Sequence, residues 1–321
     1  MPDATPWEQG EIVGDWTYPI CQWLETAAAQ GEGICQEDTL GGVFTWSEEN
    51  RKAHAQAQAQ GKAKPRARTG RSTPALIVQV GERRICLYDT GRRHAGEHRA
   101  ALLTKREPGR DKPLVRSDAL SSNTAEEAAL IRGPCLAHGR RKCTEIAEVF
   151  PSERAVVVPA LKVIYEHDEA ARTPQLSAAE RFGSPHTSRV PVFTTLKTWL
   201  AQQTAERRGE PPRSVGKAIA SLLDHWDTLT RVLKVPGAPL DTNVAERAVR
   251  LVIRQRKTSL FYASEHSADI ASILTRVIAT GVHAGVKALA YLVAVQDHRH
   301  EVFANPSAWL PWNYAAALVP S

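Results

Sequence analysis

The chain has 321 residues, of which 42% are hydrophobic, and its 41 basic and 35 acidic residues give a formal charge of +6. This length and apolar content exclude a disordered chain and allow one large domain or two ordinary ones. Five cysteines without paired spacing exclude a disulfide-stapled secreted scaffold. The start shows no leader pattern and no apolar run approaches eighteen residues, so we expect a soluble cytoplasmic protein that does not span a membrane.

The N-terminal fifth predicts a helix followed by extended chain. Apolar residues at three- and four-residue steps predict a helix over 10–30. The segment 33–46 carries scattered apolar residues around Gly41-Gly42, which predicts two strand pieces around a bulge. The run 51–71 is low in complexity, with seven basic residues and no acid. We expect a mobile loop there, either a solvated linker or a contact that follows DNA phosphates.

Strands and short helices alternate over the next part of the chain. Strands over 75–81 and 83–89 are joined at Gly81-Glu82, which predicts a hairpin. The pattern then predicts a helix, a strand, a helix, a strand and a basic helix start, over 96–106, 113–118, 124–132, 134–139 and from 140. This alternation favours an α/β fold with an open sheet.

From about 151 to 239 only helical spacing appears. Breaks are predicted at Thr173-Pro174, at the residues GSPH (183–186) and at GEPPR (209–213). Further helices are expected to follow: one that carries Glu246, and two more over 267–284 and 286–298. The chain therefore predicts a helical block placed between the strands and the helix of Glu246.

Three carboxylates occupy positions that favour chemistry. Asp38 lies on the first extended segment, Asp118 at the C-terminal end of a later strand, and Glu246 on a helix. Ligands gather at the carboxyl ends of neighbouring strands in an open sheet, so the three acids are candidates for one site. Converging carboxylates would repel one another unless cations bound between them, and Mg²⁺ is the natural counter-charge. Two such ions, for which Mn²⁺ is a substitute, would stabilise the attacking and leaving oxygens of a phosphodiester displacement.

The helix of Glu246 has a polar face rich in cations. At about 100° per residue, most of its polar residues fall within an arc of roughly 80°, and the apolar residues occupy the rest. Arginines on such a face would bind phosphates beside the metal acid. The candidate DNA-binding residues on this helix are Asn243, Arg247, Arg250, Arg254, Arg256 and Lys257. The alternative is a surface helix with an ordinary Glu246–Arg250 ion pair.

Two other groups of residues are candidates. Asp89 ends a strand, and is either a further metal ligand or a surface position beside Arg92 and Arg93. Cys135, His138 and Cys143 are either zinc ligands or buried cysteines with a histidine that faces the site. At the helix start that follows, Arg140 and Arg141 are candidates for phosphate binding, because helix amides and basic side chains would act together.

Six separated motifs resemble those of one protein family, in the same order. They are CQEDT, VRSDALSSN, PCLAHGRRKC, APLDTNVAERAVR, IRQRKTSLF and AWLPWNY, and they look like successive motifs of the insertion sequence 66 family of bacterial transposases. The resemblance implies an RNase H-like mixed sheet of three antiparallel and two parallel strands flanked by helices. It places the acidic triad on Asp38, Asp118 and Glu246. Residues 1–150 and 240–321 would form the catalytic core, with 151–239 as an all-helical insertion.

The same resemblance implies a function. It predicts Mg²⁺-dependent hydrolysis at a transposon end and strand transfer into target DNA, by a homo-oligomer on double-stranded DNA in the nucleoid. The alternatives are a metal-dependent nuclease without strand transfer and a silent DNA-binding remnant. The chain departs from the family pattern at Leu40, Ala119, Leu120, Asn123 and Thr242, and only about forty residues precede Asp38. We therefore expect a shortened member without the family's N-terminal DNA-binding region.

Overall fold

The structure is a computed structural model that forms two compact units. It describes residues 5–61, 72–117, 130–132, 151–171, 178–206, 219–220, 223–224, 226–230, 242–259 and 262–319. The first unit comprises residues 1–113, 120–129 and 244–321, and the second comprises 114–119 and 130–243. Each unit is described separately. Asp118, His138, Arg140 and Arg141 lie outside the described residues, as do Cys135 and Cys143.

Three antiparallel strands form the sheet of the first unit. They lie in the order β3-β2-β1 and span Gly33–Leu40 (β1), Ser72–Val80 (β2) and Arg83–Tyr88 (β3). The predicted hairpin between β2 and β3 is confirmed. Its two-residue turn begins at Gly81, whose φ of 57° is the left-handed conformation that glycine adopts without strain. The backbone pairing places Asp38 opposite Pro74 and Glu37 opposite Ala75.

The segment after β1 differs from the prediction. β1 ends at Leu40, and Phe44–Ala59 form helix α2, so the predicted second strand piece and the predicted loop from residue 51 are wrong over this helix. The run of alanine and glutamine favours a helix by intrinsic propensity, which outweighs the low complexity of its sequence. Backbone hydrogen bonds fix where it starts: the Phe44 amide donates to Tyr262 O at 2.8 Å and the Tyr262 amide donates to Gly42 O at 2.7 Å.

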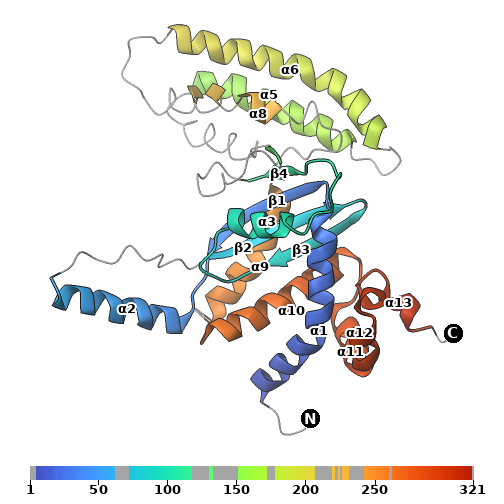
Figure 1. Ribbon diagram of the computed structural model, residues 1–321. Helices are drawn as coiled ribbons and strands as arrows, with labels where there is room; N and C mark the ends of the chain where they lie inside the picture. The colour runs from blue at the N-terminus through green and yellow to red at the C-terminus, as the bar shows by residue number, and fades with distance from the viewer. Residues whose placement is uncertain are drawn as a thin grey trace. The chain divides into compact units, whose positions relative to one another are not determined.

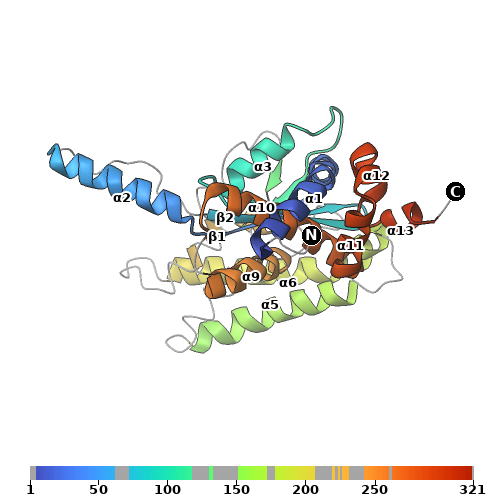
Figure 2. The same cartoon turned by 90° about the horizontal axis from the view of Figure 1, so that it is seen from below.

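Helices cover both faces of this sheet (Figures 1 and 2). In Figure 2, β1 and β2 lie between α3 and α9. Besides α2, the described helices of this unit are α1 (Pro6–Ala29), α3 (Ala95–Leu103), α9 (Asn243–Ser259), α10 (Glu265–His283), α11 (Ala288–Asp297), α12 (Arg299–Ala304), a 3-10 turn at Pro306–Trp309 and α13 (Tyr314–Ala317). The helices predicted near 10–30, 96–106, 267–284 and 286–298 are therefore present, with ends shifted by a few residues.

Helix α10 protects the outer edge of the sheet. The Cys86 amide donates to Thr280 Oγ1 at 3.0 Å and the Thr90 amide donates to Ser272 Oγ at 3.2 Å. These bonds satisfy backbone donors along β3 that would otherwise be open to another strand. No described helix is by itself long and apolar enough to cross a membrane; α10 and α11 reach that length and composition only as a pair bent by 120°.

The second unit contains a pair of short strands and a helical core. β4 (Leu114–Arg116) and β5 (Ile131–Arg132) pair in parallel, so the chain has an α/β fold with antiparallel and parallel strand pairs. Its described helical elements include α5 (Pro151–Ala171), α6 (Ala178–Glu206) and α8 (Trp226–Leu229). They bury a cluster that includes Leu161, Ile164 and Leu200.

Two predictions fail in this second unit. Ile131 and Arg132 belong to a strand, whereas the capping pattern predicted a helix through them. Their pairing with β4 is a non-local contact that the local pattern does not contain. Residues 183–186 lie inside α6, where a break was predicted. A helix continues through such a segment when packing of its apolar face outweighs the lost hydrogen bond, and the later part of α6 buries Phe193, Leu196 and Leu200.

Candidate active site

Strand β1 carries two neighbouring acids, Glu37 and Asp38, which point to opposite faces because side chains alternate along a strand. Contacts on either side of this pair identify the faces. Gln36 is fully buried and its Oε1 accepts from Arg99 Nη1 of α3 at 2.6 Å. Thr39 Oγ1 accepts from Arg256 Nη1 of α9 at 3.5 Å. The even-numbered residues of β1 therefore face α3, and the odd-numbered residues face α9.

The Asp38 carboxylate lies at the N-terminus of α3. Ser72 Oγ donates to its Oδ1 at 2.7 Å, and the Ala95 amide donates to Oδ1 and Oδ2 at 3.1 and 3.2 Å. Ala95 is the first residue of α3, so Asp38 satisfies one of the amides that a helix start leaves unpaired. Its negative charge also interacts favourably with the positive end of the helix dipole. Asp38 therefore holds β1, β2 and α3 together at one point.

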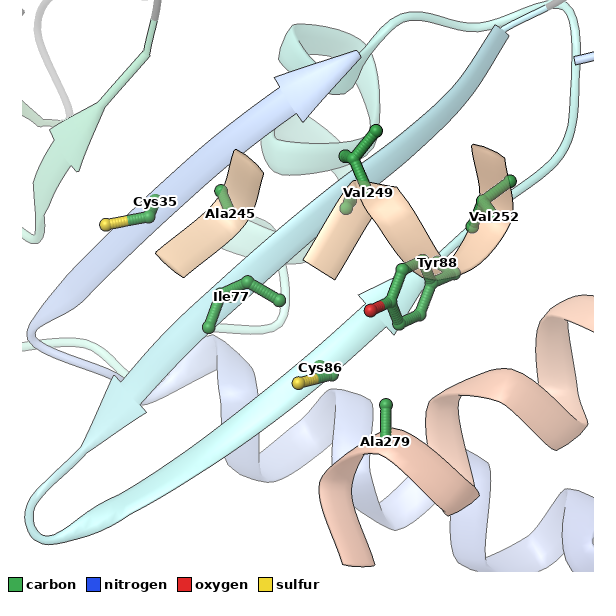
Figure 3. Packing of buried hydrophobic residues seen from close by; sticks show 9 residues of the cluster. Cys35, Ile77, Cys86, Tyr88, Ala245, Val249, Val252 and Ala279 are labelled. Atoms are coloured by element: carbon green, nitrogen blue, oxygen red, sulfur yellow. The ribbon is translucent and has the colours of Figure 1, made fainter. Parts of the chain in front are cut away.

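The opposite face of the sheet packs against α9 (Figure 3). Cys35, Ile77 and Tyr88 form one buried cluster with Ala245 and Val249 of that helix. The Tyr88 hydroxyl also donates to Ala248 O at 3.2 Å, and Arg256 Nη1 donates to Leu40 O at the end of β1. The apolar residues of α9 recur at three- and four-residue steps, and this periodicity turns one side of the helix toward the sheet.

The other side of α9 is charged, as the sequence predicted. Glu246 lies in its first turn and is half-buried, as is Asn243. Its exposed cations are Arg247, Arg250, Arg254 and Lys257. None of these four has an ion-pair partner among the residues that the structure describes. Arg256, by contrast, is held by β1 through Thr39 and Leu40, so its contact in the structure is with the strand.

Metal binding by three protein side chains is not visible in the described part of the chain. Within it, no group of three or more His, Cys, Asp or Glu side chains is close enough to hold a metal ion. Asp118 lies outside the described residues, so the structure does not bring the three predicted acids together or separate them. What the described residues do provide on the α9 side is oxygen donors, Glu37 of β1 and Glu246 of α9, and such ligands suit Mg²⁺.

A second cluster of charges surrounds Asp89, which sequence reasoning weighed as a metal ligand. Its Oδ2 accepts from Arg276 Nη2 at 2.7 Å and lies 3.1 Å from His98 Nδ1. Burial disfavours the ionised carboxylate, but the hydrogen bond from His98 and the charge of Arg276 outweigh it and lower the pKa of Asp89. Its partners are thus Arg276 and His98, whereas Arg92 pairs with Glu49. No local pattern could predict this network, because Arg276 is far from Asp89 along the chain.

This network lines a cavity of about 430 Å³ formed by β3, α1, α3 and α10. The Arg276 side chain is largely buried and also contacts Glu25 of α1, which pairs in turn with Lys105. The Arg276 Nε donates to Tyr88 O at 2.6 Å. Opposite charges are therefore matched across the wall of the cavity, which is typical of structural pairing.

The described cysteines do not support nucleophilic chemistry. Cys21, Cys35 and Cys86 are free and buried. Burial raises the pKa of the Cys86 thiol to about 12, so it stays protonated near neutral pH. Glu246 and the cations of α9 remain the better candidates for a reactive site.

The profile of the family described as "Transposase IS66 family" matches residues 48–270. The chain belongs to this transposase family. Glu246 and all the cations of α9 lie inside the matched region, whereas β1 lies before it.

Two curated relatives are described as uncharacterized, so they indicate no function for this chain. The chain is 26% identical to "Uncharacterized protein y4jD" of Sinorhizobium fredii over 189 residues, 58% of this chain and 36% of that protein. It is 30% identical to "Uncharacterized protein y4hP" of the same organism over 159 residues, 46% of this chain and 28% of that protein. The matches thus span about a third of the length of these relatives. No solved structure matches the chain.

Proposed function

We propose that this chain is the catalytic region of a DNA transposase that breaks and rejoins phosphodiester bonds with divalent metal ions. One observation carries the proposal beyond family membership: α9 packs one face on the sheet and leaves a row of exposed cations on the other, with the half-buried Glu246 at the edge of that row. Arginine forks bind phosphate oxygens in bidentate fashion, so this row suits a DNA backbone. Double-stranded DNA at transposon ends and at the target is the proposed substrate of a homo-oligomer in the cytoplasmic nucleoid.

The proposed catalytic core is RNase H-like. The antiparallel strands carry the first acid, Asp38. Strand β4, which pairs in parallel with β5, ends two residues before Asp118. In this proposal residues 1–150 and 240–321 form the core and residues 151–239 are a helical insertion. His138, Arg140 and Arg141 are proposed to assist in binding phosphate.

The proposed metal ions are two Mg²⁺, with Mn²⁺ as a substitute. Asp38, Asp118 and Glu246 were the acids predicted from sequence to hold them. When bound, such ions stabilise the attacking and leaving oxygens of a phosphodiester displacement. The protein's own residues hold the phosphates: Arg250 and Arg254 are placed to steady the strand beside Glu246, since they follow it on the same polar face of α9.

The test is a cleavage and joining assay on labelled duplexes taken from the DNA that flanks the gene, in Mg²⁺ and in Mn²⁺. We expect wild type to cleave one strand and join it to a target duplex. Glu246→Gln and Asp118→Asn should lower both rates at least about 100-fold. Glu301→Gln, at an exposed acid on α12, is the matched control and should retain the wild-type rates.

Three other results would contradict the proposed function. Cleavage without joining identifies a nuclease that lacks strand transfer. DNA binding without cleavage by wild type and both variants identifies a silent DNA-binding remnant. Equal rates for wild type and Glu246→Gln would show that α9 does not supply a catalytic acid.

A further inference from the structure

Two neighbouring acids of β1, Glu37 and Asp38, are candidates to bind the proposed metal ion. Glu37 lies between Cys35, which packs in the cluster with α9, and Thr39, which accepts a hydrogen bond from α9. Its partner across the sheet, Ala75, is fully buried in the same cluster. Because side chains two apart along a strand share a face, the Glu37 carboxylate stands on the α9 side of the sheet.

Glu246 lies on the flank of α9 that is nearer to β1. The Ala248 carbonyl accepts from the Tyr88 hydroxyl of β3, and the Ala248 side chain packs against the buried cluster that contains Tyr88, so Ala248 lies on the flank of α9 toward β3. Two residues earlier in an α-helix is a rotation of about 200°, so Glu246 lies on roughly the opposite flank. The order of the strands is β3-β2-β1, so the flank away from β3 is the flank toward β1. Figure 3 shows Ala245, the neighbour of Glu246, on the part of α9 that lies nearest β1.

Asp38 cannot join Glu246 without giving up its present partners. Its carboxylate accepts from Ser72 and from the first amide of α3, on the other face of the sheet. The buried pair Gln36–Arg99 lies on that same face, since Gln36 is two residues before Asp38 on β1. A rotation that brought Asp38 to α9 would shift β1 by one residue and expose these buried groups.

We infer that Glu37 is the β1 carboxylate that holds the divalent metal ion together with Glu246, and that Asp38 is a structural cap of α3. This inference rests on the proposed function. Both carboxylates are half-buried on the α9 side of the sheet, and carboxylate oxygens are ligands that suit Mg²⁺ and Mn²⁺. Glutamate is one methylene longer than aspartate, so Glu37 reaches farther from the strand toward the helix.

The substitutions Glu37→Gln and Asp38→Asn, at neighbouring residues of β1, test this assignment together with Glu246→Gln. Mn²⁺ is the metal ion used as the probe. Titration calorimetry on the full chain without DNA measures Mn²⁺ affinity, and thermal unfolding measures stability. We expect Glu37→Gln and Glu246→Gln each to weaken Mn²⁺ binding at least about tenfold, because each removes a charged ligand. Thermal unfolding of both variants separates a loss of metal binding from a loss of the fold.

Asp38→Asn is the matched control, because it neutralises the neighbouring acid on the opposite face. We expect it to bind Mn²⁺ as wild type does and to unfold at a temperature several degrees lower. The opposite pattern, with binding lost in Asp38→Asn and kept in Glu37→Gln, overturns the inference. It leaves the proposed function intact if Glu246→Gln still weakens binding. If wild type binds no Mn²⁺ and cleaves no DNA, the proposed function fails, and this inference fails with it.

Discussion

Two regions of the first unit contain the same kinds of charged residue in opposite arrangements. Around Asp89, the charges are paired: Arg276 contacts both Asp89 and Glu25, His98 contacts Asp89, and Lys105 contacts Glu25. On α9, four cations are exposed and lack ion-pair partners within the described ranges: Arg247, Arg250, Arg254 and Lys257. Paired charges hold elements together, whereas unpaired exposed cations stay available to an anionic ligand. The comparison separates a structural network from a candidate DNA surface, although both contain acids next to arginines.

The largest expected effect comes from opening the paired network. Arg276→Met should lower the free energy of unfolding by about 2–3 kcal/mol, because it removes the cation between Asp89 and Glu25 and leaves them only His98 and Lys105 as partners. Chemical denaturation of purified wild type and variant measures the difference. Arg254→Ala, at an exposed position on α9, is the matched control and should change stability by less than about 0.5 kcal/mol. Equal losses in the two variants would abolish the distinction between the regions.

The next effect concerns DNA affinity and comes from the exposed cations. The double variant Arg250→Ala/Arg254→Ala should weaken binding to duplex DNA about tenfold or more and reduce the salt slope by about 2, one for each lost phosphate contact. Fluorescence anisotropy at several salt concentrations measures both quantities. Arg299→Ala, an exposed arginine on α12, should leave both unchanged. A loss of the same size in that control would mean that only net charge matters.

The third effect is a pH dependence that arises at Asp89. Its pKa is lowered in the folded state, so its contribution to stability is present above the ordinary value of 3.8 and is lost as the pH falls through the folded value. Asp89→Asn should therefore cost about 1–2 kcal/mol at pH 7, where charged hydrogen bonds to His98 and Arg276 are removed. The cost should shrink as the pH falls below 4. Denaturation curves from pH 3 to 7 check this, and a cost that stays constant with pH contradicts it.

The smallest effect tests the structural role of Asp38. Ser72→Ala removes the hydroxyl that donates to this carboxylate and should lower the free energy of unfolding by about 1 kcal/mol. It should leave Mn²⁺ affinity unchanged, because Ser72 and Asp38 lie on the face away from α9. A clear loss of Mn²⁺ binding in this variant would place the metal on the α3 side of the sheet.

Local chemistry was sufficient to predict several elements. The hairpin at Gly81 follows from two apolar strands on either side of a glycine turn, and the amphipathic helix of Glu246 follows from its 3.6-residue period. The run after Trp46 shows where such reasoning failed. Its composition suggested a loop, whereas Ala and Gln propensity and the backbone bonds at Tyr262 produce a helix. The strand at Ile131 was missed because its pairing partner is not its neighbour in sequence.

The sequence by itself determined that this chain carries an acid on a cationic helix, and its motifs indicated the transposase family to which it belongs. It did not determine which neighbouring acid of β1 faces that helix. A strand has a period of two, so a shift of one residue exchanges its faces, and no single strand shows which face another element will cover. That choice was made by the tertiary structure, which packed α9 over Cys35 and Thr39 and placed the start of α3 against Asp38.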